Sequence, residues 1–226
     1  MIRFEHLKVY NIVDALRGMR NPQESWEKND SYEYLSPVVE KGRCNGSLLD
    51  GRFVHTEIGP NDLRLAKSLS KAGNDHAKFL RQILVSVDII ASMGWWIEMD
   101  TYKVATVANS TSRMHKFGSR LATAEDFDMI DIPEDMVADY ITNVNKLIKI
   151  WWESGKVKST REWRAVINYI SDGFLYRRTW TANYQVLKTI CQSDRKNHKL
   201  VEWRELVAYF LENAPYLQEI TSNDKV

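Results

Sequence analysis

The chain has 226 residues, of which 44% are hydrophobic and 27% are charged, a composition typical of a globular protein with room for a sizeable core. Its 31 basic and 30 acidic residues leave a formal net charge of +1, which gives no support for binding to nucleic acid or membrane surfaces. No apolar run approaches the length of a membrane span, and the first residues lack the apolar stretch of a signal peptide. Cys44 and Cys191 stand alone, which suggests free thiols. We therefore expect a cytoplasmic protein.

The amino-terminal part of the chain predicts a strand, a helix and then a long irregular stretch. Leu7 to Tyr10 favours a short strand, and Asn11 is expected to cap a helix that runs to about Arg17. Prolines and glycines punctuate residues 19–60, which predicts loops with short strands. Such a stretch suits a lid or an oligomer contact, but equally a plain surface loop.

The middle of the chain alternates between predicted helices and strands. Pro60 to Lys71 favours a helix with proline at its start. The further segments are a strand over Gln82 to Ile90, a helix over Ser92 to Met99 and a strand over Tyr102 to Val107.

The carboxy-terminal half is predicted to be mainly helical. The helices run from Pro133 to Glu153, from Thr160 (as the cap) to Ile170, from Ala182 to Gln192 and from Leu200 to Leu211. Phe174 to Trp180 favours a strand, and residues 221–226 are expected to form a frayed tail. The order of elements predicts an α+β protein, with residues 1–220 as a single domain in which helices pack on a small sheet.

The familiar phosphate-binding and metal-binding motifs are absent from the sequence. It contains no glycine-rich dinucleotide fingerprint, no Walker loop and no zinc-binding helix motif, and the scattered histidines and two cysteines form no metal-ligand cluster. Any bound nucleotide must therefore be held by side chains and helix ends.

The polar segment that ends at Arg113 is one candidate binding site. Asn109 to Ser112 offers amide and hydroxyl groups, and Arg113 offers a planar fork that suits phosphate. By themselves, these residue types are more typical of a solvated turn whose side chains bond their own backbone.

A second candidate is the basic and aromatic sequence from Tyr176 to Asn183, together with Asp194 to Lys199. It suits a phosphate or a nucleic-acid backbone, with stacking by Tyr176 and Trp180. Alternatively, its later cations complement the dipole of a helix that ends before them. His76 is by itself more typical of a structural histidine than of a catalyst or ligand.

The segment from Thr101 to Arg113 resembles the motif R-H-R-x-x-S-x-N-E-x-S-x-R of the flavin-dependent thymidylate synthases. Arg113 is the one identity. The conservative replacements are Lys103 for arginine, and Thr106 and Thr111 for serine. The departures are Thr101 for arginine, Tyr102 for histidine, Ala108 for asparagine and Asn109 for glutamate.

Two further segments agree with this family in order and spacing. His76 stands one helix and one strand before the motif, as a family histidine does. The aromatic strand that runs into Trp180-Thr181-Ala182-Asn183 is similar to the family's W-T-x-N, and Arg195 and His198 follow it. The likeness covers roughly residues 75–203, and its W-W-x-E-x-D-T-Y-K-V form resembles a bacteriophage branch.

The resemblance implies an α+β fold with a mostly antiparallel sheet, as in thymidylate synthase-complementing proteins. It also implies a homotetramer, FAD as cofactor, dUMP or a related pyrimidine nucleotide as substrate, and methylene-tetrahydrofolate and NADPH as co-substrates. A membrane partner is not implied, and nucleic acid is not the expected ligand.

Carried over by position, the resemblance implies a role for nine residues. The nucleotide-binding set is Glu98, Asn109, Thr111, Arg113 and Arg195, with Arg195 as the catalytic residue. The flavin-binding set is His76, Lys103, Thr106 and Asn183. Glu98 stands where the family has a glutamine, and a carboxylate would suit an amino-bearing base such as cytosine.

The neutral pair Thr101-Tyr102 replaces two groups that should hold flavin phosphates in the family. Each lost charge-assisted bond removes about 1.5–3 kcal/mol. One expectation is that Arg177 or Arg178 compensates for these lost bonds to the flavin phosphates. The alternative is a catalytically degenerate protein that binds a nucleotide or a protein partner on the same scaffold.

Overall fold

A computed structural model describes residues 1–222, which divide by their internal contacts into two compact units. Unit 1 comprises residues 1–3, 89–101 and 109–178; unit 2 comprises residues 4–88 and 102–108 and the chain from Thr179 onward. The single domain expected over residues 1–220 stays a prediction. None of the helices within residues 1–222 is both long and apolar enough to cross a membrane.

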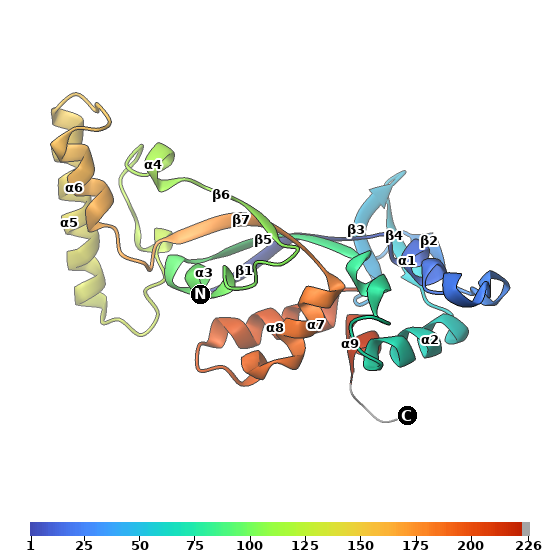
Figure 1. The fold of residues 1–226 in the computed structure, drawn as a ribbon. Helices are drawn as coiled ribbons and strands as arrows, with labels where there is room; N and C mark the ends of the chain where they lie inside the picture. The colour runs from blue at the N-terminus through green and yellow to red at the C-terminus, as the bar shows by residue number, and fades with distance from the viewer. Residues whose placement is uncertain (223–226) are drawn as a thin grey trace. The chain divides into compact units, whose positions relative to one another are not determined.

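The larger sheet has four strands in the order β1-β5-β7-β6 (Figure 1). Its strands are β1 (Arg3–Tyr10), β5 (Leu84–Ser92), β6 (Val107–Ser110) and β7 (Leu175–Asn183). All four of these strands contribute residues to both units. In β5, Val85, Val87 and Ile89 are fully buried while the residues between them are more exposed, which is the alternation of a strand with one face on a core.

Residues 19–60, expected as loops with short strands, contain a three-stranded antiparallel sheet with the order β2-β4-β3. Its strands are β2 (Tyr32–Ser36), β3 (Cys44–Leu49) and β4 (Arg52–Glu57). The β3–β4 hairpin turns at Asp50 and Gly51, with φ angles of 50° and 71°. Two positive φ angles in succession are what a tight hairpin of this hand requires, and Asp-Gly is a favoured pair there.

Gly46 in β3 is required by a close approach of two backbones. Its φ is 80°, and a Cβ added there would lie 1.9 Å from the carbonyl oxygen of Leu7 in β1. We expect Gly46→Ala to destabilise the fold by about 2–4 kcal/mol, because strain and a backbone clash add. Gly51→Ala is the matched control, since its φ is 71° and no atom lies within 4 Å of the added Cβ. Equal losses in urea unfolding for the two variants would contradict the role of the clash.

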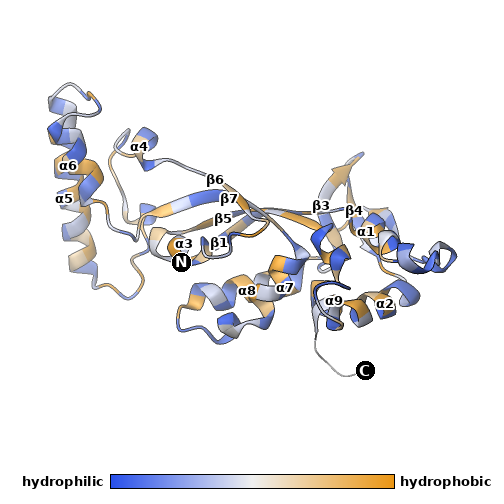
Figure 2. Ribbon diagram, viewed as in Figure 1, coloured by the Kyte–Doolittle hydropathy of each residue, from blue (hydrophilic) through white to orange (hydrophobic). Residues whose placement is uncertain are grey.

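The helices of unit 2 are amphipathic and bury one face each. They are α1 (Ile12–Gly18), α2 (Pro60–Lys71), α7 (Tyr184–Gln192), α8 (Val201–Asn213) and α9 (Leu217–Thr221). α2 packs against α9 and α7 against α8, and each carries hydrophobic and hydrophilic residues in alternation (Figure 2). The large side chains Tyr184, Trp203 and Phe210 of α7 and α8 are fully buried and belong to the core of the unit.

Unit 1 is built on a helical hairpin with its own core. Its helices are α3 (Met93–Met99), α4 (Arg113–Lys116), α5 (Glu134–Glu153) and α6 (Arg161–Tyr169). α5 and α6 lie side by side (Figure 1), and their shared cluster includes Ile148, Trp151 and Val166. Thr160 caps α6 as predicted, because its hydroxyl accepts a hydrogen bond from the Trp163 N–H at 3.3 Å.

Three local predictions are wrong. Asn11 does not cap α1: it has φ of 69°, and its amide donates instead to the carbonyl of Gln82. Tyr102 to Val107 is a turn, and the strand β6 begins only at Val107. Thr221, placed in the frayed tail, is buried as the last residue of α9, whereas residues 223–226 of that tail lie outside the described residues.

Candidate functional site

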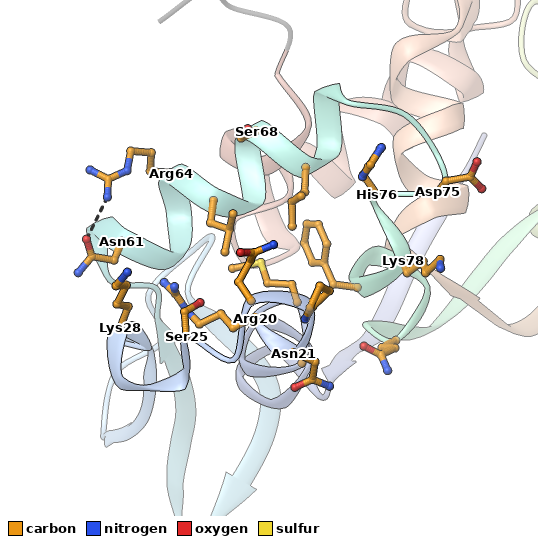
Figure 3. Close-up of a pocket in the computed structure, with 18 of the residues that line it drawn as sticks. Arg20, Asn21, Ser25, Lys28, Asn61, Arg64, Ser68, Asp75, His76 and Lys78 are labelled. Atoms are coloured by element: carbon orange, nitrogen blue, oxygen red, sulfur yellow. Dashed lines mark hydrogen bonds between the residues drawn. The ribbon is translucent and has the colours of Figure 1, made fainter.

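A groove of about 1280 Å³ lies in unit 2. Three segments form it: residues 18–28 after α1, the exposed side of α2, and residues 75–82 around η3 (Lys78–Arg81). His76, predicted near the cofactor, lies on its lining and is exposed. Figure 3 shows His76, Asp75 and Lys78 toward one end of the groove, and Lys28 and Arg64 toward the other.

The groove combines an apolar floor with a cationic rim. Met19, Leu65 and Leu69 are half-buried in its lining and Phe79 is buried. The charged side chains of its exposed rim are Lys28, Arg64, Lys78 and Arg81, against the single carboxylate of Asp75. Its volume exceeds that of an ordinary small-molecule site, and its chemistry suits a large anionic ligand with apolar rings.

A buried ion pair fixes the wall of the groove. Asp62 is fully buried in α2, and its Oδ1 accepts from the Arg20 Nε at 2.7 Å. Its Oδ2 accepts from the Asn29 amide at 2.7 Å, the Ser31 hydroxyl at 2.6 Å and the Asp30 N–H at 3.1 Å. Arg20 is itself 4% exposed. The segment after α1 is therefore held to α2 by a carboxylate whose oxygens are all used.

The predicted catalytic residue Arg195 lies in a second cluster of unit 2. It belongs to η5 (Asp194–Asn197), and its Nε donates to the hydroxyl of Tyr102 at 3.2 Å. The guanidinium carbon lies 4.0 Å from the centroid of the Trp203 ring, in cation–π contact. Trp203 is fully buried, so it gives Arg195 a rigid support.

Tyr102 is presented by a tight turn. The Thr106 hydroxyl donates to the Tyr102 carbonyl at 2.5 Å, and Ala105 takes the left-handed conformation with φ of 58°. This closure explains why the segment is not a strand. Lys103 in the same turn is exposed.

Asn183, the fourth predicted cofactor residue, has a structural role in unit 2. Its side chain caps α7 by accepting from the Val186 N–H at 3.1 Å, and the residue is 5% exposed. Of the predicted cofactor set, His76 thus lines the groove, while Lys103, Thr106 and Asn183 lie on other segments of the unit. Their cofactor roles stay predictions.

The other predicted nucleotide residues lie in unit 1. Thr111 N–H donates to the Arg177 carbonyl at 2.9 Å, and the Thr111 hydroxyl accepts from the Arg177 N–H at 3.3 Å. That hydroxyl still has its own proton to donate to an anion. Asn109 is exposed in β6, and Glu98 is half-buried in α3.

Arg113 is half-buried at the start of α4, close enough to Tyr176 to act on its ionisation. Burial raises the pKa of the Tyr176 hydroxyl, and the positive charges of Arg113 and Arg178 partly oppose that rise. A cavity of about 210 Å³ lies beside this loop, lined by Thr111, Ser112 and Lys116 among others. Hydroxyls and cations around a small cavity suit a phosphate group.

The aromatic residues of the basic strand β7 are not available for base stacking. Tyr176 is 4% exposed and Trp180 3%, so neither offers a ring face for base stacking. Arg178 Nη1 bonds both carboxylate oxygens of Asp100, at 2.9 and 3.1 Å, and its guanidinium lies 4.4 Å from the Trp96 ring centroid. These contacts within unit 1 give Arg178 a structural role, and its role as a substitute phosphate ligand stays a prediction.

Sequence reasoning missed the cations of the groove. Lys78 and Arg81 stand three residues apart in η3, beside His76, and this spacing was the available signal. It was weak because cations at such spacing usually form a solvated face. The contribution of residues 18–28 carried no local signal, because only packing brings them opposite α2.

The fold is that of the flavin-dependent thymidylate synthases, as the comparisons with solved structures show. Thymidylate synthase X of Helicobacter pylori, solved with FAD and dUMP, matches with a TM-score of 0.68 and 13% identity, over 99% of this chain and 98% of that chain. A second structure of the flavin-dependent thymidylate synthase of Helicobacter pylori, complexed with FAD and dUMP, gives 0.65 and 14%, over 97% and 99%. The UMP/dUMP methylase PolB of Streptomyces cacaoi, bound with 5-Br dUMP, gives 0.59 and 10%, over 98% and 95%.

Comparison by sequence gives a different result. No protein-family model matches the chain, and no curated protein matches it. The expected α+β fold with antiparallel sheets and packed helices is thus confirmed by structural likeness. The sequence identities to these structures are only 10–14%.

Proposed function

We propose that this protein transfers a one-carbon unit from methylene-tetrahydrofolate to dUMP or a related pyrimidine nucleotide, with FAD as its cofactor. The observation that carries the proposal is the likeness over nearly the whole length of both chains to a synthase solved with FAD and dUMP. The likeness to PolB, a UMP/dUMP methylase, supports the same class of substrate. Because one fold hosts many activities, the chemistry of the cavities must also suit these ligands.

The loop of Thr111 and Arg113 is proposed to bind the nucleotide phosphate. The Thr111 hydroxyl and the Lys116 ammonium group line the small cavity, and Arg113 follows two residues after Thr111 on the same loop, so the loop offers the hydroxyl and the cations that a phosphate needs. Arg195 is proposed to bind the nucleotide through its planar guanidinium group. Glu98 is proposed to read the base, and an acceptor-only carboxylate would favour a base that carries an amino group.

The groove around His76 fits a flavin dinucleotide. Its cationic rim suits the diphosphate, its apolar floor of Leu65, Leu69 and Phe79 suits the ring system, and its volume is sufficient. Lys78, Arg81 and His76 are the residues that would hold FAD there. The flavin would supply the redox chemistry, while the chain binds, orients and excludes water.

The absorption spectrum of the purified protein, with and without added FAD, tests this proposal directly. We expect a flavin band that stays with the protein through gel filtration, and formation of a methylated or hydroxymethylated pyrimidine nucleotide when methylene-tetrahydrofolate and NADPH are added. Protein that retains no FAD and yields no product from dUMP or dCMP would refute the proposed activity.

Removal of two groove cations should weaken FAD binding. Each charge-assisted bond to a phosphate contributes about 1.5–3 kcal/mol, so Lys78→Ala with Arg81→Ala should raise the FAD dissociation constant by roughly 100-fold or more. Flavin fluorescence titration measures the change. Lys8→Ala is the matched control, since Lys8 is an exposed lysine of β1. An unchanged dissociation constant in the double variant would place the cofactor elsewhere.

A specific observation also favours a second candidate, a nucleotide-binding or protein-binding scaffold without turnover. Several motif positions are engaged in structural contacts: Thr101 donates to the Glu98 carbonyl, Thr106 closes its own turn and Asn183 caps a helix. On this reading dUMP binds while FAD does not. The same spectrum separates the two candidates, because the scaffold would be colourless and still bind nucleotide.

The proposed assembly is a homotetramer. Val38, Val39, Leu48 and Leu49, all within residues 19–60, are between 51% and 65% exposed. Apolar side chains gathered on one segment suit a contact with a second copy of the chain, which favours the oligomer role for this stretch over a plain surface loop. Light scattering during gel filtration measures the assembly mass.

A further inference from the structure

Tyr102 stands at the position where the related motif has a histidine, and the structure gives it a specific partner. Its hydroxyl accepts a hydrogen bond from the Nε of Arg195 at 3.2 Å, across 93 residues of sequence. The same guanidinium lies 5.8 Å from the Tyr102 ring centroid and 4.0 Å from that of Trp203. The two aromatic rings are themselves neighbours, with centroids 5.8 Å apart and an interplanar angle of 52°.

This geometry fixes the plane of the guanidinium. The Trp203 ring supports one face, and the Tyr102 bond at Nε sets the rotation about the axis perpendicular to that face. The two terminal amino groups then point in a defined direction. Since these groups form the fork that binds a phosphate or carboxylate in a bidentate manner, their direction decides how Arg195 meets an anion.

The support for Tyr102 is built into the fold. Thr106 closes the turn that carries Tyr102, and Trp203 is fully buried in α8. Ser193 accepts from the Arg195 N–H at 3.3 Å, which fixes the start of η5. Backbone and ring supports thus restrain all three side chains before any ligand binds.

We propose that Tyr102 is a positioning residue that orients Arg195 for an anionic nucleotide. The inference rests on the proposed function, because that function gives Arg195 its role. It assigns a purpose to a departure from the related motif: the residue found in place of the histidine serves the arginine and not a flavin phosphate.

A double-mutant cycle on dUMP binding tests the proposal. Tyr102→Phe keeps the ring and removes the hydroxyl, so we expect the dUMP dissociation constant to rise roughly 10-fold in calorimetry. Arg195→Gln should have a larger effect, and Tyr102→Phe should add nothing in that background because Tyr102 acts through Arg195. Tyr10→Phe, at a half-exposed tyrosine of β1, is the matched control. An effect of Tyr102→Phe that persists at full size in Arg195→Gln would overturn the proposal.

Tyr102→His adds a readout that a merely structural role would not move. A neutral imidazole accepts the Arg195 bond, whereas an imidazolium repels the guanidinium, and an unperturbed histidine titrates at about pH 6.5. The dissociation constant of this variant, divided by that of the wild type at the same pH, should therefore fall toward 1 at pH 8 and rise at pH 5.5. A ratio that does not depend on pH would count against the proposal.

A measurement without nucleotide separates this inference from the proposed function. Phenylglyoxal modifies accessible arginines, and peptide mass spectrometry reports the rate at Arg195. We expect Tyr102→Phe to speed the modification of Arg195 several-fold and to leave that of Arg164, an exposed arginine of α6, unchanged. If the wild-type protein binds no dUMP, and Arg195 is still modified faster in Tyr102→Phe than in the wild type, the proposed function fails while the positioning contact stands. Equal rates at Arg195 in the two proteins would refute the positioning role.

Discussion

Arg113→Ala should raise the dissociation constant of dUMP by about 10- to 100-fold, with the fold intact. The reason is the loss of a charge-assisted bond to the phosphate, which contributes about 1.5–3 kcal/mol. Arg113 is half-buried beside Tyr176, so the lost cation is not one of the freely solvated surface charges. Calorimetric titration with dUMP measures the change, and circular dichroism checks the fold.

Two further variants sharpen this result. Arg113→Lys keeps the charge and loses the planar fork, so its dissociation constant should fall between those of the wild type and Arg113→Ala. Arg164→Ala removes an exposed arginine from the same unit and should leave binding within about twofold, because a solvated surface charge contributes little. Wild-type affinity in Arg113→Ala would remove the phosphate role from this loop.

Asp62→Ala should destabilise the protein by about 3–5 kcal/mol, a large part of the total stability of a typical domain. The substitution leaves the guanidinium of Arg20, which is 4% exposed, without its carboxylate. It also removes the acceptor for Asn29 and Ser31. Urea unfolding followed by tryptophan fluorescence gives the free energy of unfolding.

The control for this prediction is Asp14→Ala, at an exposed aspartate of α1, which should change stability by less than about 0.5 kcal/mol. Arg20→Met combined with Asp62→Ala should cost less than the sum of the single variants, because no buried charge is then left unpaired. A loss below about 1 kcal/mol in Asp62→Ala would mean that water reaches the pair and that the groove wall is held by other contacts.

These variants also separate binding from architecture. Substitutions of Arg113, Lys78 and Arg81 are expected to change ligand affinity. They should leave stability close to that of the wild type, since none of these residues is buried. Asp62 is expected to change stability first and ligand affinity only as a consequence. A protein that lost nucleotide and flavin binding together in Asp62→Ala, while still folded, would show that the groove wall and the binding sites are coupled.

Local signals were sufficient for most helices and for the fold class. The proline at the first position of α2, the Thr160 cap of α6 and the apolar stripe of α5 act within a few residues, so the sequence alone locates these elements. The resemblance to the flavin-dependent thymidylate synthases rested on three short segments, and the structural likeness over the whole chain confirms the fold that they implied.

The sequence predicted the types of residue in the candidate site much better than their arrangement in space. Hydroxyl and guanidinium chemistry singled out the loop of Thr111 and Arg113, the resemblance assigned that loop to the nucleotide phosphate, and these roles stay predictions. The turn at Tyr102 was mistaken for a strand because alternating apolar residues hid the Thr106 closure and the left-handed Ala105. The bond between Tyr102 and Arg195 joins residues 93 positions apart, and no local pattern reports such a contact.

By itself, the sequence located most of the longer helices to within a few residues, predicted an α+β fold and showed which chemistry the polar segments offer. The tertiary structure alone decided that residues 18–28 face α2 across a groove, that Asp62 is a buried anchor and that Arg195 rests on Trp203. The physical reason is the distance along the chain over which each kind of interaction acts. Caps and hydrophobic periodicity act over one or two turns of helix, whereas cavities and ion pairs form between segments that only the packing of the core brings together.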